Sequence, residues 1–241
     1  GDADTPLPWV NVIANPHFGT VVGATGAAWT WSENSRENRL TSCAHDAVSE
    51  PTSETLILRD DDTDEIWGAT PGPMARTRGT QWVVRHGRGF TRFERHGTPL
   101  RQTLDIFVSP SEPVKLSVLA LTNASSSIRR LSVFSHTEWL LGPPRLGHQR
   151  HVVTSLDAET GAIFASNRFR DAAWSERLAF AWSSTPPRSF CGDRRDFLGR
   201  HGTIQRPRAL SEPSLSNRVG GGLDPCATFQ VEVVLHPGDT R

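Results

Sequence analysis

The chain has 241 residues, enough for one large domain or two small ones. Its 26 basic and 26 acidic residues balance, without a long run of one sign, which argues against nucleic acid or an anionic membrane surface as a partner. Cys43, Cys191 and Cys226 are too few and too scattered for a disulfide framework or a CxxC metal site, and no apolar run is long enough to cross a bilayer. We therefore expect a cytoplasmic domain without a metal or cofactor of its own.

The first notable stretch, residues 27–40, reads "AAWTWSENSRENRL". Trp29 and Trp31 fall on the same face of a predicted strand, about 6.5–7 Å apart along it. Two indoles at this spacing can form a platform for sugar rings, or they can belong to the core of a sandwich. Spacing alone favours the core.

A run of polar side chains follows the tryptophans. Glu33, Asn34, Arg36 and Arg39 could address hydroxyl groups or a phosphate, but the same residues also suit a solvated turn with weak internal ion pairs. Spacing alone favours the turn.

Acidic and histidine side chains offer two further candidate sites. Asp60, Asp62 and Asp64 alternate as in a calcium loop, but the sixth and twelfth positions lack the glycine and glutamate of an EF-hand, so a hairpin turn between 55–59 and 65–70 is predicted. His45 and Asp46 could form a base with its orienting carboxylate, yet no nucleophile or metal motif accompanies them. The glycine-rich stretches lack the spacing of a nucleotide site.

Strict alternation dominates the middle of the chain and predicts strands. Such runs occur at 100–109, 114–123, 129–141, 177–184 and 228–236. Their aligned apolar residues are Leu100, Leu104, Ile106 and Val108; Val114, Leu116, Val118 and Ala120; Leu131, Val133 and Trp139; Leu178, Phe180 and Trp182; and Phe229, Val231, Val233 and Leu235.

Helical signals are almost absent, apart from a short candidate at 170–178. Residues 184–225 are rich in Gly, Pro and Arg and predict a long surface excursion, in which Phe190, Phe197 and Leu198 must still find packing partners. A Pro-Gly turn after the last strand normally delivers another strand. Spaced strands with polar turns indicate an all-β, antiparallel sandwich with few short helices.

Several blocks in fixed order resemble a known family. They include "PWVNVIANPHFGTVVGATGAAWTWSENSRENRLT", "LILRDDDTDEIWGAT", "VVRHGRGFTRFERH", "LSVFSHTEWLLG", "DRRDFLGRHG" and "GGLDPCATFQVEVVLHPGD". From Pro8 to Asp239 the chain resembles the N-terminal region of glycoside hydrolase family 94, formerly glycosyltransferase family 36. The sequence of these blocks is most similar to the phosphorylase-like segment of cyclic β-1,2-glucan synthases and to β-1,2-oligoglucan phosphorylases.

The resemblance implies a large super-sandwich domain similar to mutarotase-like folds, followed in relatives by an (α/α)6 barrel that carries the catalytic machinery. It also implies that residues 1–241 form one domain excised from a longer chain, because Gly1 is not a translation start. Such a fragment is expected to be non-catalytic, while the parent enzyme would use inorganic phosphate or a sugar donor. The parent could also be the cytoplasmic part of an inner-membrane synthase.

Two functions follow from the resemblance. The first is a carbohydrate-contacting domain that helps to wall a β-glucan oligosaccharide site of the barrel, and its expected contact residues are Trp31, Glu33, Asn34, Arg36, Arg39 and Asp46. The second is a structural domain for barrel packing and homodimerisation without sugar affinity of its own. Around Asp46 the chain departs from the family, whose tryptophan, asparagine and proline are replaced by Cys43, His45 and Ala47.

Overall fold

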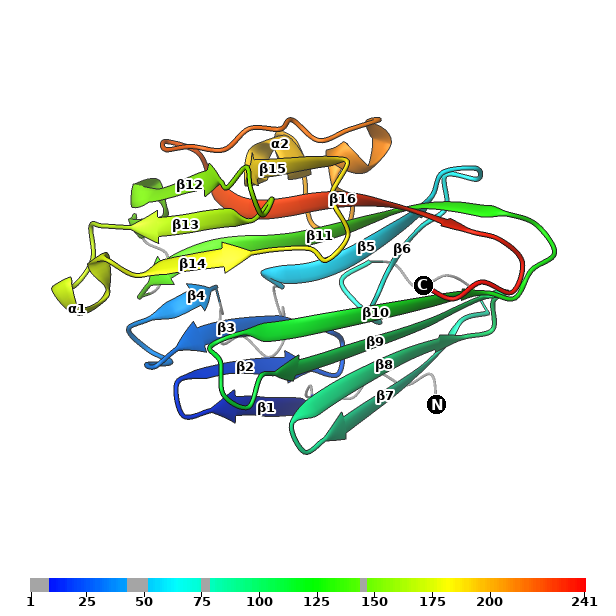
Figure 1. Ribbon diagram of the computed structural model, residues 1–241, viewed down its shortest axis with the longest axis horizontal. Helices are drawn as coiled ribbons and strands as arrows, with labels where there is room; N and C mark the ends of the chain where they lie inside the picture. The colour runs from blue at the N-terminus through cyan, green and yellow to red at the C-terminus, as the bar shows by residue number, and fades with distance from the viewer. Residues whose placement is uncertain (1–8, 43–51, 75–78, 144–146) are drawn as a thin grey trace.

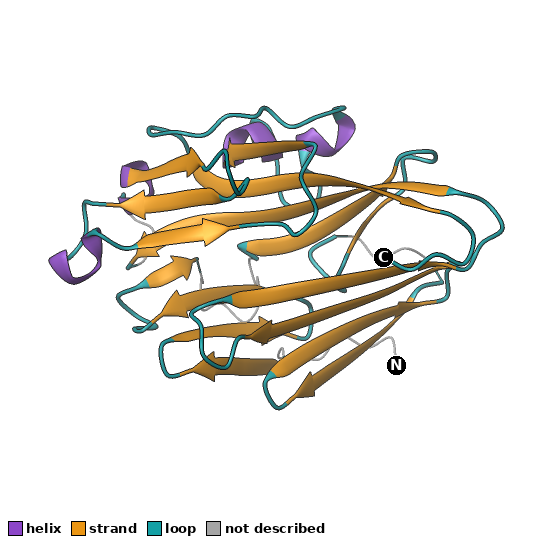
Figure 2. Cartoon of the chain, in the orientation of Figure 1, coloured by secondary structure: helices purple, strands orange, loops and turns teal. Residues whose placement is uncertain are grey.

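The computed structural model describes residues 9–42, 52–74, 79–143 and 147–241. Its strands form three antiparallel sheets, and the helices within these ranges are short (Figures 1 and 2). The predicted all-β antiparallel class is therefore confirmed. No helix in the described ranges is long and apolar enough to cross a membrane.

The largest sheet has nine strands in the order β1-β2-β3-β4-β11-β16-β15, and β5 joins through β11 with β6 at its side. The long strand β11 pairs with β5 along one half and with β4 beyond it. The strands of this sheet are β1 (Val10–Asn15), β2 (Phe18–Gly23), β3 (Ala28–Ser32), β4 (Arg39–Thr41), β5 (Glu54–Asp60), β6 (Ile66–Gly68), β11 (Arg129–Gly142), β15 (Ser189–Asp193) and β16 (Pro225–Leu235).

Two smaller sheets have the orders β10-β9-β8-β7 and β12-β13-β14. Their strands are β7 (Gln81–Gly87), β8 (Phe90–His96), β9 (Leu100–Val108), β10 (Lys115–Asn123), β12 (Val152–Leu156), β13 (Ile163–Asn167) and β14 (Leu178–Ala181). The helical segments are η1 (His148–His151), α1 (Ala172–Ser175), α2 (Arg194–Leu198) and η2 (Arg208–Ser211).

Both smaller sheets pack on the same face of the large sheet, which we call its inner face. One buried cluster joins strands β1–β5, β11 and β16 to residues of β8, β9 and β10 such as Phe93 and Leu104. A second joins Trp139 and Phe229 to Ile163 and other residues of the β12–β14 sheet. The expected core face of 100–108 is confirmed, because the pattern of burial along β9 follows the alternation.

On the opposite, outer face of the large sheet, the described residues of one later segment pack over β5, β11 and β16. Residues 184–225, expected as a surface excursion, supply β15, α2 and η2 and pack Phe197 and Leu198 on Ile57 and Phe134. The expectation that these apolar residues need partners is confirmed. In Figure 1, α2 lies along the upper edge of the molecule, away from β1–β4.

On three strands, the face that is buried or exposed differs from the expectation. Leu116 and Val118 of β10 are exposed, and Leu121 faces the core instead. Leu178 and Phe180 of β14 and Trp182 just after it are 64%, 48% and 57% exposed. The polar face of β11, which carries Ser132, His136 and Glu138, is buried beneath residues 184–225.

Two further local predictions are confirmed. β5 and β6 form the predicted hairpin, and the Asp60 side chain accepts hydrogen bonds from the backbone N–H groups of its turn. The short helix expected within 170–178 is α1, capped by Asp171. After the Pro-Gly turn, Arg241 exchanges two backbone hydrogen bonds with Leu121 of β10.

Candidate functional site

The two tryptophans lie on the outer face of β1–β4, which residues 184–225 leave bare. Cross-strand pairing places Trp29 opposite Val21 and Val21 opposite Val12, while Trp31 lies opposite Gly19 and Arg39. Direct partners in an antiparallel sheet share one face. We call this surface the tryptophan face: Val12, Ala14, Gly19, Val21, Trp29, Trp31 and Arg39.

Trp31 rests against the backbone of β2 because residue 19 is a glycine. A Cβ added to Gly19 would lie 2.2 Å from Cζ2 of the Trp31 indole, so the ring occupies the space that a side chain would need. The centroids of the Trp29 and Trp31 rings are 5.0 Å apart, with the rings inclined by 40°. Neither ring belongs to the buried hydrophobic clusters of the described residues, and both rings are partly buried on the opposite face of the strand.

Arg39 closes one side of the tryptophan pair. Its guanidinium carbon lies 5.2 Å from the centroid of the Trp29 ring, and its Nε donates a hydrogen bond of 2.8 Å to the carbonyl of Ser35. The residue is only 7% exposed. Trp29 is thus held between Arg39 and Trp31, which orients both indoles.

The polar turn between β3 and β4 adjoins this face. Asn34 Oδ1 accepts hydrogen bonds from the backbone N–H groups of Arg36 and Glu37, at 2.9 and 3.0 Å. Asn34 therefore builds the turn, as the alternative interpretation proposed for this run. The Arg36 side chain is 86% exposed, and an ion pair joins it to Glu37.

A second segment, which sequence reasoning did not connect to the site, contacts this turn. Arg170 donates a 2.8 Å hydrogen bond to Oδ1 of the buried Asn38, and Arg177 forms an ion pair with Glu33. Arg177 also lies over the Trp174 ring at 5.4 Å. The only available signal was the Arg- and Trp-containing helical candidate at 170–178, which carried no hint of its distant partner.

The predicted site residues therefore fall into three groups. Trp31 and Arg39 lie on the tryptophan face, and Glu33, Asn34 and Arg36 lie in the adjoining turn. Asp46 lies outside the described residues, as do His45 and Cys43.

The inner side of β3 is anchored by a buried polar network. Thr30, between the two tryptophans, and Thr41 both donate hydrogen bonds to Oε1 of Glu54, at 2.7 and 2.6 Å. The Lys115 ammonium pairs with Oε2 of the same carboxylate, and burial lowers the pKa of Lys115 to about 7. This network ties β3 and β4 to β5 and β10 and makes the tryptophan face a rigid surface.

A second polar cluster lies under α2, on the covered half of the sheet. Arg194 Nε donates a 2.6 Å hydrogen bond to Glu138, and His136 stacks on Phe197 with ring centroids 4.5 Å apart. Burial by itself raises the pKa of the Glu138 carboxyl, but the hydrogen bonds and positive charges of His136 and Arg194 outweigh burial and lower the pKa to about 2. This cluster anchors α2. Within the described ranges, no three His, Cys, Asp or Glu side chains gather as metal ligands.

The arrangement of the tryptophan face determines what it can bind. Rigid, partly exposed indoles offer apolar ring faces, and Glu33, Arg36 and Arg177 in the adjoining loops offer charged hydrogen-bonding groups. Aromatic faces beside polar side chains suit ligands that are apolar on one side and polar at the edge, as sugar rings are.

The sequence matches the glycosyl hydrolase 94 supersandwich domain over residues 1–241. Cyclic beta-(1,2)-glucan synthase NdvB of Rhizobium meliloti (strain 1021) is 33% identical, over 100% of this chain and 8% of the relative. N,N'-diacetylchitobiose phosphorylase of Vibrio proteolyticus is 25% identical, over 98% and 30%, and solabiose phosphorylase of Paenibacillus borealis is 28% identical, over 98% and 31%.

The chain thus spans about a third or less of the length of these curated relatives. The profile match covers the full chain, and the three-sheet architecture agrees with it. This protein belongs to the glycosyl hydrolase 94 family, as a supersandwich domain.

Proposed function

We propose that this domain contacts a β-glucan oligosaccharide through the tryptophan face and the turn beside it, and so helps to wall the substrate site of a longer enzyme. The observation that carries the proposal is Trp31, whose indole rests on Gly19 on the outer face of β2 and β3 and stays partly exposed. The relatives support the substrate class, because their names refer to a β-1,2-glucan and to disaccharides.

In this proposal the domain is non-catalytic and acts within a parent glycoside phosphorylase or glucan synthase. A catalytic barrel elsewhere in the parent chain would supply the reaction and its phosphate or sugar donor. Trp31, Arg36 and Glu33 would be contact residues, whereas Asn34 would act indirectly by holding the turn. Cytoplasmic location belongs to the same proposal.

The alternative is a purely structural domain that packs on the barrel or on a second copy. The exposed apolar side chains on the outer face of β14 favour it, because exposed apolar patches mark contact surfaces. The two functions differ in one measurable respect. Only the first predicts sugar affinity for the isolated 241-residue chain.

Thermal unfolding with added β-1,2-glucooligosaccharides separates the two. Ligand at about 100 times its Kd stabilises a protein by about 2.7 kcal/mol, which should raise Tm by several degrees for a chain of this length. We expect Trp31→Ala to abolish this shift. Trp182→Ala, which removes an exposed indole just after β14, is the matched control and should retain it. If Tm of the unmodified chain does not change at tens of millimolar ligand, the structural function is the one that remains.

A further inference from the structure

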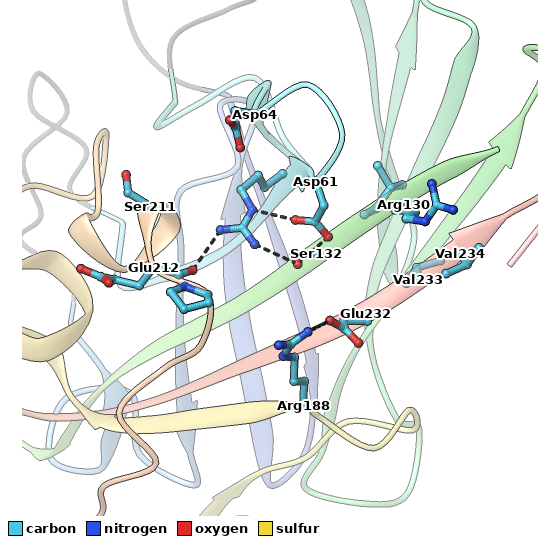
Figure 3. A pocket seen from close by; sticks show the side chains of 13 residues that line it. Asp61, Asp64, Arg130, Ser132, Arg188, Ser211, Glu212, Glu232, Val233 and Val234 are labelled. Carbon is cyan, nitrogen blue, oxygen red and sulfur yellow. Dashed lines mark hydrogen bonds and ion pairs between the residues drawn. The ribbon is translucent and has the colours of Figure 1, made fainter. Parts of the chain in front are cut away.

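A groove of about 520 Å³ opens on the outer face of the large sheet, outside the tryptophan face (Figure 3). Its floor is formed by β5, β11 and β16, and its walls are formed by the turn after β5 and by the residues that follow η2. The volume lies within the range of about 300–1,000 Å³ that is usual for small-molecule sites.

Charged side chains in register line the floor. Ser132 on β11 is the direct partner of Arg59 on β5 and of Glu232 on β16, so these three side chains form one row across the sheet. Arg188 extends the row through its ion pair with Glu232, and Asp61 follows at the β5 side. In Figure 3, Asp61, Ser132 and Glu232 lie around the same hollow.

The floor is rigid before any ligand arrives. Arg59 donates from Nη1 to the carbonyls of Leu210 and Glu212 at 2.6 and 3.1 Å, and from Nε to Asp61 at 2.7 Å. Ser132 in turn donates to the second oxygen of Asp61 at 2.9 Å. The wall and the floor are therefore joined, and the Asp61 carboxylate is held in place beside the hollow.

The charges of the lining nearly cancel. Three arginines stand against four carboxylates, and all three arginines have an acidic partner, in Asp61, Asp62 and Glu232. An anion such as phosphate would meet the carboxylates, and a metal cation would meet the guanidinium groups. A neutral ligand avoids both penalties.

Hydroxyl groups suit such paired charges especially well. A hydroxyl donates one hydrogen bond and accepts others, so it can bridge a guanidinium and its carboxylate without separating their charges. The apolar part of the lining, which includes Pro213 and Val234, offers small patches for C–H groups but no aromatic platform. A polyhydroxylated ligand fits this lining better than an apolar one.

We propose that this groove is a second carbohydrate site, which binds a neutral oligosaccharide of about two sugar units independently of the tryptophan face. Glu232 and Arg188 would contact hydroxyl groups directly, Asp61 would accept a hydrogen bond, and Arg59 would act as a positioning residue. The site does not depend on the proposed function, because it uses other strands and other residues.

Calorimetric titration of the 241-residue chain with sophorose, a neutral β-1,2-linked glucose disaccharide, tests the groove. The titration is made in a Trp31→Ala background, which removes the tryptophan face as a competing site. We expect sophorose to bind with a millimolar Kd, and Val234→Trp, which fills the groove without changing a charge, to weaken binding at least tenfold. Glu232→Gln should weaken it about fivefold or more, because a charge-assisted hydrogen bond is lost.

Two controls make the result specific. Asp105→Asn breaks a comparable two-bond ion pair with Arg92 on the outer face of β8 and β9, and it should leave the affinity unchanged. Glucose 6-phosphate, an anionic probe, should bind more weakly than sophorose. Thermal unfolding of each variant confirms that it is folded.

Three results would overturn the groove site. These are an absence of binding heat in the Trp31→Ala background, an unchanged Kd in folded Val234→Trp, or tighter binding of the anionic probe. Failure of the tryptophan-face proposal looks different, because sophorose would then bind equally well with and without Trp31.

Discussion

The two halves of the outer face of the large sheet differ in how far the rest of the chain covers them. Over β5, β11, β16 and β15, the chain returns after residue 184 and buries Ile57 and Phe134 completely. Over β1–β4, which we call the bare half, residues 184–225 do not pack on the sheet: Val12 is 61% exposed, Trp29 and Trp31 are partly buried, and Arg39 is buried beside them. Both halves carry large apolar side chains, yet only one of them is core.

The comparison separates side chains that hold the fold from side chains that are available for contact. Burial of an apolar side chain stabilises a domain roughly in proportion to the area removed from water. Aromatic side chains that stay partly exposed beside exposed apolar residues suit contact with a partner or ligand. Mutations of fully buried side chains on the covered half should therefore change stability, whereas mutations on the tryptophan face should mainly change binding.

The largest expected effect lies on the covered half. Phe197→Ala removes a fully buried ring that packs on His136 and on the outer face of the sheet. We expect a loss of about 3–5 kcal/mol in the free energy of unfolding, the usual range for phenylalanine-to-alanine changes in a core. Urea unfolding followed by fluorescence measures it.

Trp31→Ala on the bare half provides the contrast. Although tryptophan is larger than phenylalanine, we expect this change to cost only about 1 kcal/mol, because the indole keeps part of its surface in water. Equal losses for the two variants would contradict the division into a covered and a bare half.

The next effect concerns acid stability of the covered half. The pKa of Glu138 is about 2 in the folded chain and about 4.5 in an unfolded one, so its ionised form stabilises the fold. This stabilisation, on the order of 3 kcal/mol, is fully present above about pH 5 and is lost as the pH falls toward 2. Glu138→Gln should therefore be less stable at pH 7 and should show a flatter decline in acid.

Stability measured between pH 2 and pH 7 checks this prediction. Glu37→Gln is the matched control, because its carboxylate pairs only with the exposed Arg36 across the turn on the bare half. The control should follow the unmodified chain at every pH. A parallel acid decline in Glu138→Gln and the unmodified chain would show that the Arg194 anchor adds no stability.

Alternation in the sequence was sufficient to predict β9, β10, β11, β14 and β16, because side chains on a pleated strand point to opposite faces in turn. It could not predict which face would be covered. On β10, Leu116 and Val118 alternate with Leu119 and Leu121, so either face could have been core. The pairing of Lys115 with Glu54 and the register with β9 decide the matter, and both are long-range.

The same reason explains what was missed at the candidate site. The polar side chains of β11 looked solvent-facing until residues 184–225 covered them, and the contacts of Arg170 and Arg177 span more than a hundred residues. The local part of the site could be predicted from the sequence, since Trp31 and Arg39 are neighbours across one hairpin. What the tryptophans pack against could not, because it depended on a glycine in another strand.

That glycine gives a smaller but more specific prediction. Gly19→Ala places a Cβ in the space of the Trp31 ring and should displace the indole at a stability cost of about 1 kcal/mol, since a partly exposed side chain can swing aside. Tryptophan fluorescence should change, and any glucan affinity of the tryptophan face should fall. Gly221→Ala, whose new Cβ would meet its nearest atom at 3.5 Å, should change neither.

The smallest expected effect on stability belongs to Arg36. Its side chain is 86% exposed and pairs only with the neighbouring Glu37, so Arg36→Ala should change the free energy of unfolding by less than about 0.5 kcal/mol. Arg39→Ala, three residues on, should cost more because it removes the hydrogen bond to Ser35 and the contact with Trp29. If Arg36 reaches the ligand, Arg36→Ala should still weaken glucan binding in calorimetry while Tm stays constant. A Tm loss as large as that of Arg39→Ala would instead show that Arg36 stabilises the fold. The proposal that the turn contacts the ligand would then lose the residue that supports it most.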